Sequence, residues 1–245
     1  MRVTLDPRRP RVETKYRVAV EDVPALLRRI PADDREDYGV RTLYFDHPDG
    51  SLARKALEDP LLCTKVRARE YHDGSPWIWF EVKNREGRWT RKSRLKLSRA
   101  QAGRWITGTF SASEESIVAP ESEGDGDNDA RRYLQAVLRR DLLPIGAVVA
   151  FRRSFTLKKD IVRITLDQEI TYHRPAVSSS GQPGMIGALL RRESSPVLEV
   201  KHVGTVPSCC LELVEPLRRS TYSKFRTLVQ SLAESGMGAD RVDRL

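Results

Sequence analysis

Residues 62–96 read LCTKVRAREYHDGSPWIWFEVKNREGRWTRKSRLK, a pattern that predicts three β-strands joined by two tight turns. Side chains alternate between the two faces of a strand. Lys65, Arg67 and Arg69 therefore share one face of the first strand. Three like charges on one face repel one another, so their grouping needs a physical reason.

The other two predicted strands repeat this arrangement. Trp79, Glu81 and Lys83 share one face of the second strand, and the apolar residues between them take the other face. Lys92 and Arg94 share a face of the third strand. A meander whose polar face meets water would explain any single strand. The same arrangement, however, recurs later in the chain on strands whose opposite face is strongly apolar.

Length and charge set the broad class of the protein. With 245 residues, of which 39% are hydrophobic, the chain is long enough for one domain with a sizeable core or for two small domains. Its net charge of +9 indicates a polyanionic partner, which could be nucleic acid, an anionic membrane or a phosphate compound. Charge alone does not choose among these three classes.

Membrane, secreted and zinc proteins have sequence signatures that are not seen here. No apolar run approaches the roughly 18 residues of a membrane span, and the first residues contain no apolar segment of the signal-peptide type. We therefore expect a cytoplasmic protein without a membrane span. Cys63, Cys209 and Cys210 lack the spacing of metal ligands, so the sequence indicates neither a disulfide framework nor a zinc site.

Hydrophobic periodicity predicts eight strands and four helices. Strands are expected at 11–20, 40–46, in three segments of 62–96, and at 146–157, 160–172 and 195–203; helices are expected at 21–30, 98–106, 129–142 and 220–235. Strands in up-and-down order favour an antiparallel sheet that closes on itself. We predict an α+β fold with a closed eight-stranded antiparallel β tunnel, helices packed outside it, and a single domain over residues 1–245.

One segment differs sharply in composition from the rest of the chain. Residues 111–129 contain seven acidic residues and no basic residue, with too little apolar content to pack. Such a composition is typical of a mobile segment. We expect an acidic insert within the domain.

The later strands again place charges opposite an apolar face. Arg163 and Asp167 share one face of their strand with Thr165, and Glu199 and Lys201 share a face of another. If the apolar faces meet helices, the charged faces must point into the barrel. Burying unpaired charges costs several kcal/mol each. The interior would therefore hold water and a multivalent anion.

A series of short motifs in chain order resembles the VTC-type polyphosphate polymerase domain, a member of the triphosphate tunnel metalloenzymes, which include the CYTH enzymes. The resemblance covers roughly residues 12–232, apart from the acidic insert. The motifs are ExKY (13–16), LYFD (43–46), KVRxR (65–69), FEVK (80–83), KxR (92–94), FRRSF (151–155), VRITLD (162–167), LEVKH (198–202) and YSKF (222–225).

The resemblance implies a tunnel in which the terminal phosphate of ATP passes to a growing polyphosphate chain, with Mn²⁺ or Mg²⁺ present. ATP and polyphosphate are then the expected partners, and no nucleic acid is expected. The catalytic cations carried over from the family are Arg67, Arg69, Lys83, Arg163 and Lys201; the phosphate-binding residues are Lys15, Lys65, Lys92, Arg94, Arg153 and Lys224.

Carboxylates complete the implied site. Glu199 matches the metal-binding glutamate of the family, whereas Glu81 and Glu13 have two open interpretations: they bind metal, or they balance the cations of the tunnel. Arg152 and Arg153 are adjacent and point in opposite directions. Only Arg153 fits the motif register, so we expect Arg152 on the exterior.

Three functions stay open at the level of sequence. CYTH hydrolases begin with a paired ExExK, and the single Glu13 of this chain favours the polymerase branch. An inorganic or nucleoside triphosphatase of the same fold is the first alternative. A non-catalytic module that binds polyphosphate or nucleic acid is the second, although aromatic residues, at 7%, are few for the stacking platforms that single-stranded nucleic acid requires.

Overall fold

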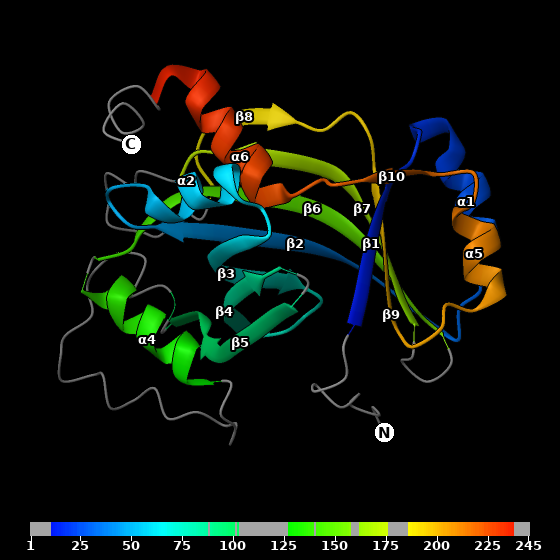
Figure 1. Cartoon of the computed structure of the whole chain (residues 1–245), viewed down its shortest axis with the longest axis horizontal. Coiled ribbons are helices and arrows are strands. Elements are labelled where there is room, and N and C mark those ends of the chain that lie inside the picture. Colours follow the sequence, from blue (N-terminus) through cyan, green and yellow to red (C-terminus); the bar gives the residue numbers. More distant parts are fainter. Residues whose placement is uncertain are drawn as a thin grey trace. The chain divides into compact units, whose positions relative to one another are not determined.

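The computed structural model describes residues 11–87, 89–100, 102, 127–139, 141–157, 162–175 and 186–237 (Figure 1). Most of the acidic insert and most of the helix expected at 98–106 lie outside these ranges, as do residues 176–185. The last residues assigned to the insert lie in a helix, α4, at Asp127–Leu138.

The described residues form ten strands, two more than predicted. They hydrogen-bond in the order β10-β1-β9-β7-β6-β2-β3-β4-β5, and β8 pairs with β7. Each pairing whose register is known is antiparallel. This order has two ends, at β10 and β5, so the antiparallel sheet is confirmed for the described strands, but the closed eight-stranded tunnel is not.

The chain divides into two compact units, each assembled from three segments. Unit 1 comprises Met1–Gly39, Ala150–Ile170 and Arg192–Tyr222, and unit 2 comprises Val40–Val149, Thr171–Arg191 and Ser223–Leu245. Strands β2 (Asp34–Asp46), β6 (Leu143–Leu157) and β7 (Val162–His173) contribute residues to both units. The expectation of a single domain stays a prediction.

Unit 1 contains, besides parts of these strands, β1 (Arg11–Arg17), β9 (Val197–Val203), β10 (Arg218–Ser220), the 3-10 turn η1 (Val20–Asp22) and helices α1 (Val23–Arg29) and α5 (Ser208–Val214). Helices α1 and α5 lie side by side in Figure 1, and Arg29 donates a hydrogen bond to the Glu212 carbonyl, at 2.8 Å. Leu26 and Leu213 from these helices pack with Ile164 of β7 in one apolar cluster.

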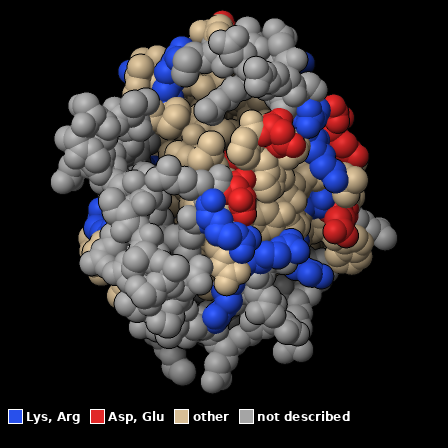
Figure 2. All heavy atoms as spheres, turned by 90° about the vertical axis from the view of Figure 1, so that its left-hand side faces the viewer, with Lys and Arg blue, Asp and Glu red and all other residues tan. Residues whose placement is uncertain are grey.

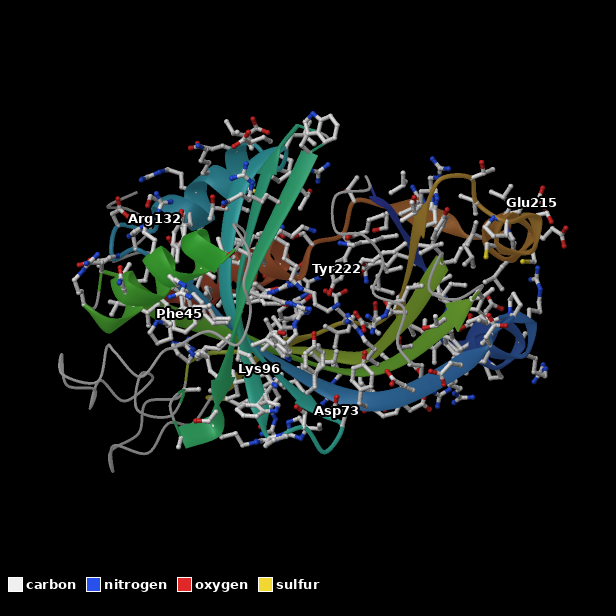
Figure 3. The ribbon with its side chains drawn as sticks, turned by 90° about the horizontal axis from the view of Figure 1, so that it is seen from below. Phe45, Asp73, Lys96, Arg132, Glu215 and Tyr222 are labelled. Atoms are coloured by element: carbon white, nitrogen blue, oxygen red, sulfur yellow. The ribbon has the colours of Figure 1, made fainter. Side chains whose placement is uncertain are left out.

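Unit 2 contains α2 (Ser51–Glu58), β3 (Leu62–His72), β4 (Trp77–Glu86), β5 (Trp89–Ser98), α4, β8 (Leu189–Arg192, whose last residue belongs to unit 1), α6 (Lys224–Leu232) and the π-helical turn η3 (Ala233–Met237). Helix α4 covers the apolar face of β4 and β5 (Figure 1). Phe45, labelled in Figure 3, packs in this core with Phe80 and Leu134.

The three strands predicted within residues 62–96 are confirmed. Gly74 and Gly87 occupy the two turns with φ of 82° and 59°, a backbone conformation that glycine adopts without a Cβ clash. Asp46, at the end of β2, accepts backbone hydrogen bonds from His47, Leu52 and Ala53 and so fixes the start of α2. The two turns connect β3, β4 and β5 in a single antiparallel register.

Candidate functional site

One face of the β3-β4-β5 sheet in unit 2 carries the cations that the sequence placed together. Cross-strand register puts Lys65, Lys83 and Lys92 in one row across the three strands. The next row contains Arg67, Glu81 and Arg94. The opposite face of these strands packs into the apolar core with Val66, Phe80 and Leu95. We call the charged side the cationic face.

Glu81 is the charged centre of the cationic face. Its side chain is 2% exposed, and its carboxylate lies 2.8 Å from the Arg67 guanidinium, 3.6 Å from the Arg69 guanidinium and in direct contact with the Lys92 ammonium. Burial acts to raise the pKa of Glu81, but these three cations hold the pKa well below the ordinary value. An ionised Glu81 therefore balances the cations, and a role of Glu81 in metal binding stays a prediction.

The same environment that favours the charged form of Glu81 disfavours the charged form of Lys92. Burial, together with Arg67 and Arg69, lowers the pKa of Lys92 to about 7, although Glu81 acts to raise it. The side chain is nevertheless 41% exposed, so its ammonium can exchange protons with solvent. Lys92 can thus change charge near neutral pH, which an arginine cannot do.

Aromatic residues hold the other cations of this face in place. The Arg94 guanidinium lies 4.5 Å from the centre of the Trp79 ring, and the Lys96 ammonium lies 4.2 Å from that of Trp77. Such contacts contribute about 0.5–1 kcal/mol at exposed sites. Arg69 is fixed differently, because its Nε donates a hydrogen bond to Thr42 Oγ1, at 3.4 Å.

The start of α6 adds further groups to the cationic face. Ser223 caps this helix, and its Oγ accepts a hydrogen bond from Lys65 Nζ, at 3.0 Å. Lys224 is the first residue of α6, and Phe225 packs against Tyr44 with ring centres 5.1 Å apart. The structure therefore brings the predicted residues Lys65 and Lys224 to the same part of unit 2.

Unit 1 contains a second cluster, around Glu199 on β9. In the register of β1 and β9, Glu13 lies opposite Lys201, and Lys15 lies opposite Glu199. The Lys201 ammonium lies 2.5 Å from the Glu199 carboxylate and 3.7 Å from that of Glu13. The Lys15 ammonium lies 3.3 Å from Glu13. Two carboxylates and two ammonium groups thus alternate on adjacent strands.

Glu199 remains ionised in this cluster. Burial acts to raise the pKa of Glu199, but Lys201, Lys15 and Arg152 hold the pKa well below the ordinary value of a glutamate. Arg163 lies opposite Lys201 in the register of β7 and β9, and its guanidinium donates to Ser154 Oγ, at 3.1 Å, and to the Tyr38 hydroxyl, at 3.0 Å. The predicted residues Glu13, Lys15, Arg163, Glu199 and Lys201 are therefore neighbours in unit 1.

The prediction that Arg152 lies on the exterior is wrong. Its guanidinium forms two hydrogen bonds with the Asp167 carboxylate, at 2.6 and 2.8 Å, and its side chain is only 13% exposed. The adjacent Arg153 instead lies 3.5 Å from Asp37, where both side chains are partly exposed. Asp167 shares its face of β7 with Arg163, so the arginine on that side of unit 1 is Arg152.

The carboxylates of unit 1 fit a hard divalent cation. Mg²⁺ and similar ions are usually held by one or two carboxylates together with substrate phosphates and water, and Glu199 and Glu13 supply two. Thr165 lies opposite Glu199, is 3% exposed, and its hydroxyl has no hydrogen-bond partner in the described structure. Within that structure no three His, Cys, Asp or Glu residues form a metal cluster. Phosphate oxygens would therefore have to complete the coordination.

The predicted site residues fall into two groups, and sequence reasoning missed several of their partners. Unit 1 contains Glu13, Lys15, Arg153, Arg163, Glu199 and Lys201; unit 2 contains Lys65, Arg67, Arg69, Glu81, Lys83, Lys92, Arg94 and Lys224. That all of them line one cavity stays a prediction. Sequence reasoning did not place Tyr38, Tyr44 or Arg152 among the site residues, although Tyr44 stands within the LYFD motif and could have been found there.

The surface and the helices add two further observations. Figure 2 shows basic and acidic side chains next to one another on the face that it presents, so positive charge is not a property of the whole surface. Among the helices of the described residues, none combines the length and the hydropathy needed to cross a membrane. The cytoplasmic location stays a prediction.

Comparison with known proteins identifies the fold and the family. The structure is similar to a putative adenylate cyclase from Bacillus halodurans, with 17% identity, a TM-score of 0.53 and coverage of 89% of this chain and 98% of that chain. Two other solved structures match less closely. They are a putative adenylyl cyclase from Hippeastrum with a dominant triphosphatase activity (16% identity, TM-score 0.48, coverage of 92% and 96%) and a conserved hypothetical protein from Pyrococcus furiosus (11%, 0.46, 88% and 98%).

A search of curated proteins gave no match to the sequence. The model of the VTC domain, in contrast, matches residues 10–233. This range includes every strand and helix of the described residues except most of the π-helical turn η3, which extends beyond residue 233. The chain therefore belongs to the VTC domain family.

Proposed function

We propose that this protein is a metal-dependent phosphotransferase that passes the terminal phosphate of ATP to a growing polyphosphate chain. The observation that carries the proposal is the row of Lys65, Lys83 and Lys92 on three adjacent strands. Like charges directly opposite one another destabilise a sheet, although the Glu81 carboxylate of the next row contacts Lys92. A chain of phosphates would supply further negative charge along the whole row.

The chemistry of phosphoryl transfer matches the residues of both clusters. Negative charge spreads over the oxygens of the transferred group in the transition state, so fixed cations and a metal provide most of the catalysis. Arg67 and Arg94 can bind phosphate oxygens through two N–H groups at once, whereas the lysines act as point charges. No nucleophilic Ser, Cys or His is required.

The metal is proposed to be Mn²⁺ or Mg²⁺, held by Glu199 with help from Glu13. When bound, the ion would neutralise charge on the phosphate oxygens. Lys201 and Lys15 keep Glu199 ionised and therefore ready to bind a cation. Thr165, whose hydroxyl has no partner among the described residues, can bond to an oxygen ligand next to Glu199.

The proposal is tested by incubating the purified protein with ATP and Mn²⁺, and then measuring ADP and separating polyphosphate by gel electrophoresis. We expect long chains together with ADP. Orthophosphate without chains would contradict the proposal and identify a triphosphatase. Binding of polyphosphate with neither product would identify a binding module without catalysis. Chelation of the metal with EDTA should stop the formation of chains.

Lys92 predicts a pH dependence of phosphate binding. With a pKa lowered to about 7, Lys92 is charged below that pH and loses its charge as the pH rises. We expect the affinity for tripolyphosphate to fall by roughly 10-fold between about pH 7 and pH 9 through loss of one charge-assisted contact. Isothermal titration calorimetry at several pH values measures this fall.

The matched control for this pH dependence is Lys92→Arg. Arginine stays protonated over this range, so the variant should lose much less affinity as the pH rises. Comparing the two proteins at each pH cancels the ionisation of tripolyphosphate itself. Parallel pH profiles for the wild type and the variant would show that Lys92 does not titrate in the site.

A further inference from the structure

Tyr44 lies on the same side of β2 as the cationic face of β3. Leu43 and Phe45, its neighbours in the chain, pack into the apolar core of unit 2. Because side chains alternate along a strand, Tyr44 and Thr42 point to the opposite side. Arg69 of β3 donates its hydrogen bond to Thr42 on that side. The side of β2 that carries Tyr44 is therefore continuous with the cationic face.

The ring of Tyr44 is buried and packs against the ring of Phe225. The residue is 2% exposed, and its ring packs at 5.1 Å against Phe225 at the start of α6. Lys65 approaches the same place, since its ammonium lies 6.0 Å from the centre of the Phe225 ring and contacts Ser223. Phenylalanine would serve the packing equally well, so packing alone does not explain the hydroxyl.

The buried Tyr44 side chain is surrounded by positive charge from four neighbouring cations. Burial acts to raise the pKa of Tyr44, yet Arg67, Arg69, Lys65 and Lys224 together lower the pKa below its ordinary value. A hydroxyl in a field of four cations is well placed to meet an anionic oxygen.

We propose that the Tyr44 hydroxyl donates a hydrogen bond to a phosphate oxygen of the bound substrate. This makes Tyr44 a substrate-binding residue beside Lys65, Arg67 and Lys224, and it adds a neutral donor to these three cations. The inference rests on the proposed function in taking the ligand to be a chain of phosphates. It goes beyond that function by assigning a role to a residue of the LYFD motif.

The first test measures the affinity for inorganic tripolyphosphate by calorimetry. Tyr44→Phe removes the donor and keeps the ring against Phe225, so we expect about 10-fold weaker binding with unchanged thermal unfolding. Tyr16→Phe is the matched control, because Tyr16 is a buried tyrosine in the apolar cluster of unit 1. The control should bind tripolyphosphate as the wild type does.

The second test follows ionisation of Tyr44 directly by ultraviolet absorbance at alkaline pH. Subtracting the titration of Tyr44→Phe from that of the wild type isolates one tyrosine of the seven in the chain. Tripolyphosphate should raise the pKa of this tyrosine, because the bound anion opposes formation of a tyrosinate. A residue with only a structural role would show no ligand-dependent shift.

The outcomes separate this inference from the proposed function. If the wild type makes polyphosphate and Tyr44→Phe binds tripolyphosphate within twofold of it, the role of Tyr44 is wrong and the proposed function stands. If Tyr44→Phe binds weakly and the ligand shifts the tyrosine titration, but ATP gives no chains, the role of Tyr44 stands and the proposed function is wrong. Failure of the wild type to bind tripolyphosphate would overturn the inference.

Discussion

Replacement of Glu199 by Gln is expected to abolish phosphate transfer from ATP, with turnover at least roughly 100-fold below that of the wild type. The carboxylate is held ionised by Lys201 and Lys15 in spite of burial, and it is the group proposed to bind the divalent cation. The amide has the same shape but no charge. Release of ADP at saturating ATP and Mn²⁺ measures the loss.

Two further measurements show whether this loss comes from the metal. The Mn²⁺ concentration that gives half-maximal activity should rise in Glu199→Gln, whereas circular dichroism should be unchanged, because glutamine can still accept a hydrogen bond from Lys201. Glu215→Gln is the control, because this substitution removes an equal charge. Glu215 follows α5 in the same unit and is exposed (Figure 3). Full activity of Glu199→Gln would remove Glu199 from the site.

The strands that the sequence predicted well are those in which local signals agree. In β3, β4 and β5, alternation of charged and apolar residues continues for whole strands, and glycines with positive φ stand in both turns. The elements that were missed are short: α2, α5, β8 and β10. A strand such as β10, with the three residues Arg218–Ser220, is stable only through its pairing with β1, which local sequence does not reveal.

The same argument applies to the candidate site. Alternation correctly grouped Lys65, Arg67 and Arg69 on one face, because the other face of β3 is apolar and fixes the phase. It could not identify partners from distant parts of the chain. The contact between Lys65 and Ser223 joins residues 158 positions apart, and only the fold brings them together.

Arg152 shows where alternation fails. In β6, residues 151–153 are all partly buried, so no strict alternation marks which arginine points inward. Asp167 determines which of the two arginines points inward, because its carboxylate accepts two hydrogen bonds from Arg152. A single strand read alone contains no information about this partner on β7. The family motif gave the wrong register for the same reason.

The pair of Arg152 and Asp167 leads to the largest predicted effect on stability. Arg152→Met keeps most of the side-chain volume but leaves Asp167, which is 1% exposed, without the guanidinium that neutralises it. Breaking a buried ion pair by removal of one partner costs about 3–5 kcal/mol. We expect a decrease of that size in the free energy of unfolding, measured by urea denaturation at pH 7.

Arg153→Met is the matched control, because it removes the same charge from the next residue of the same strand. Arg153 and Asp37 are both partly exposed and lie 3.5 Å apart, and exposed ion pairs contribute only about 0–1 kcal/mol. The second mutation Asp167→Asn should recover part of the stability lost in Arg152→Met, since it removes the buried charge that Arg152 no longer neutralises. Equal destabilisation by Arg152→Met and Arg153→Met would mean that the buried pair is not the source of the effect. A larger loss of stability in Arg153→Met would support the orientation that the motif register predicted, with Arg153 inside and Arg152 outside.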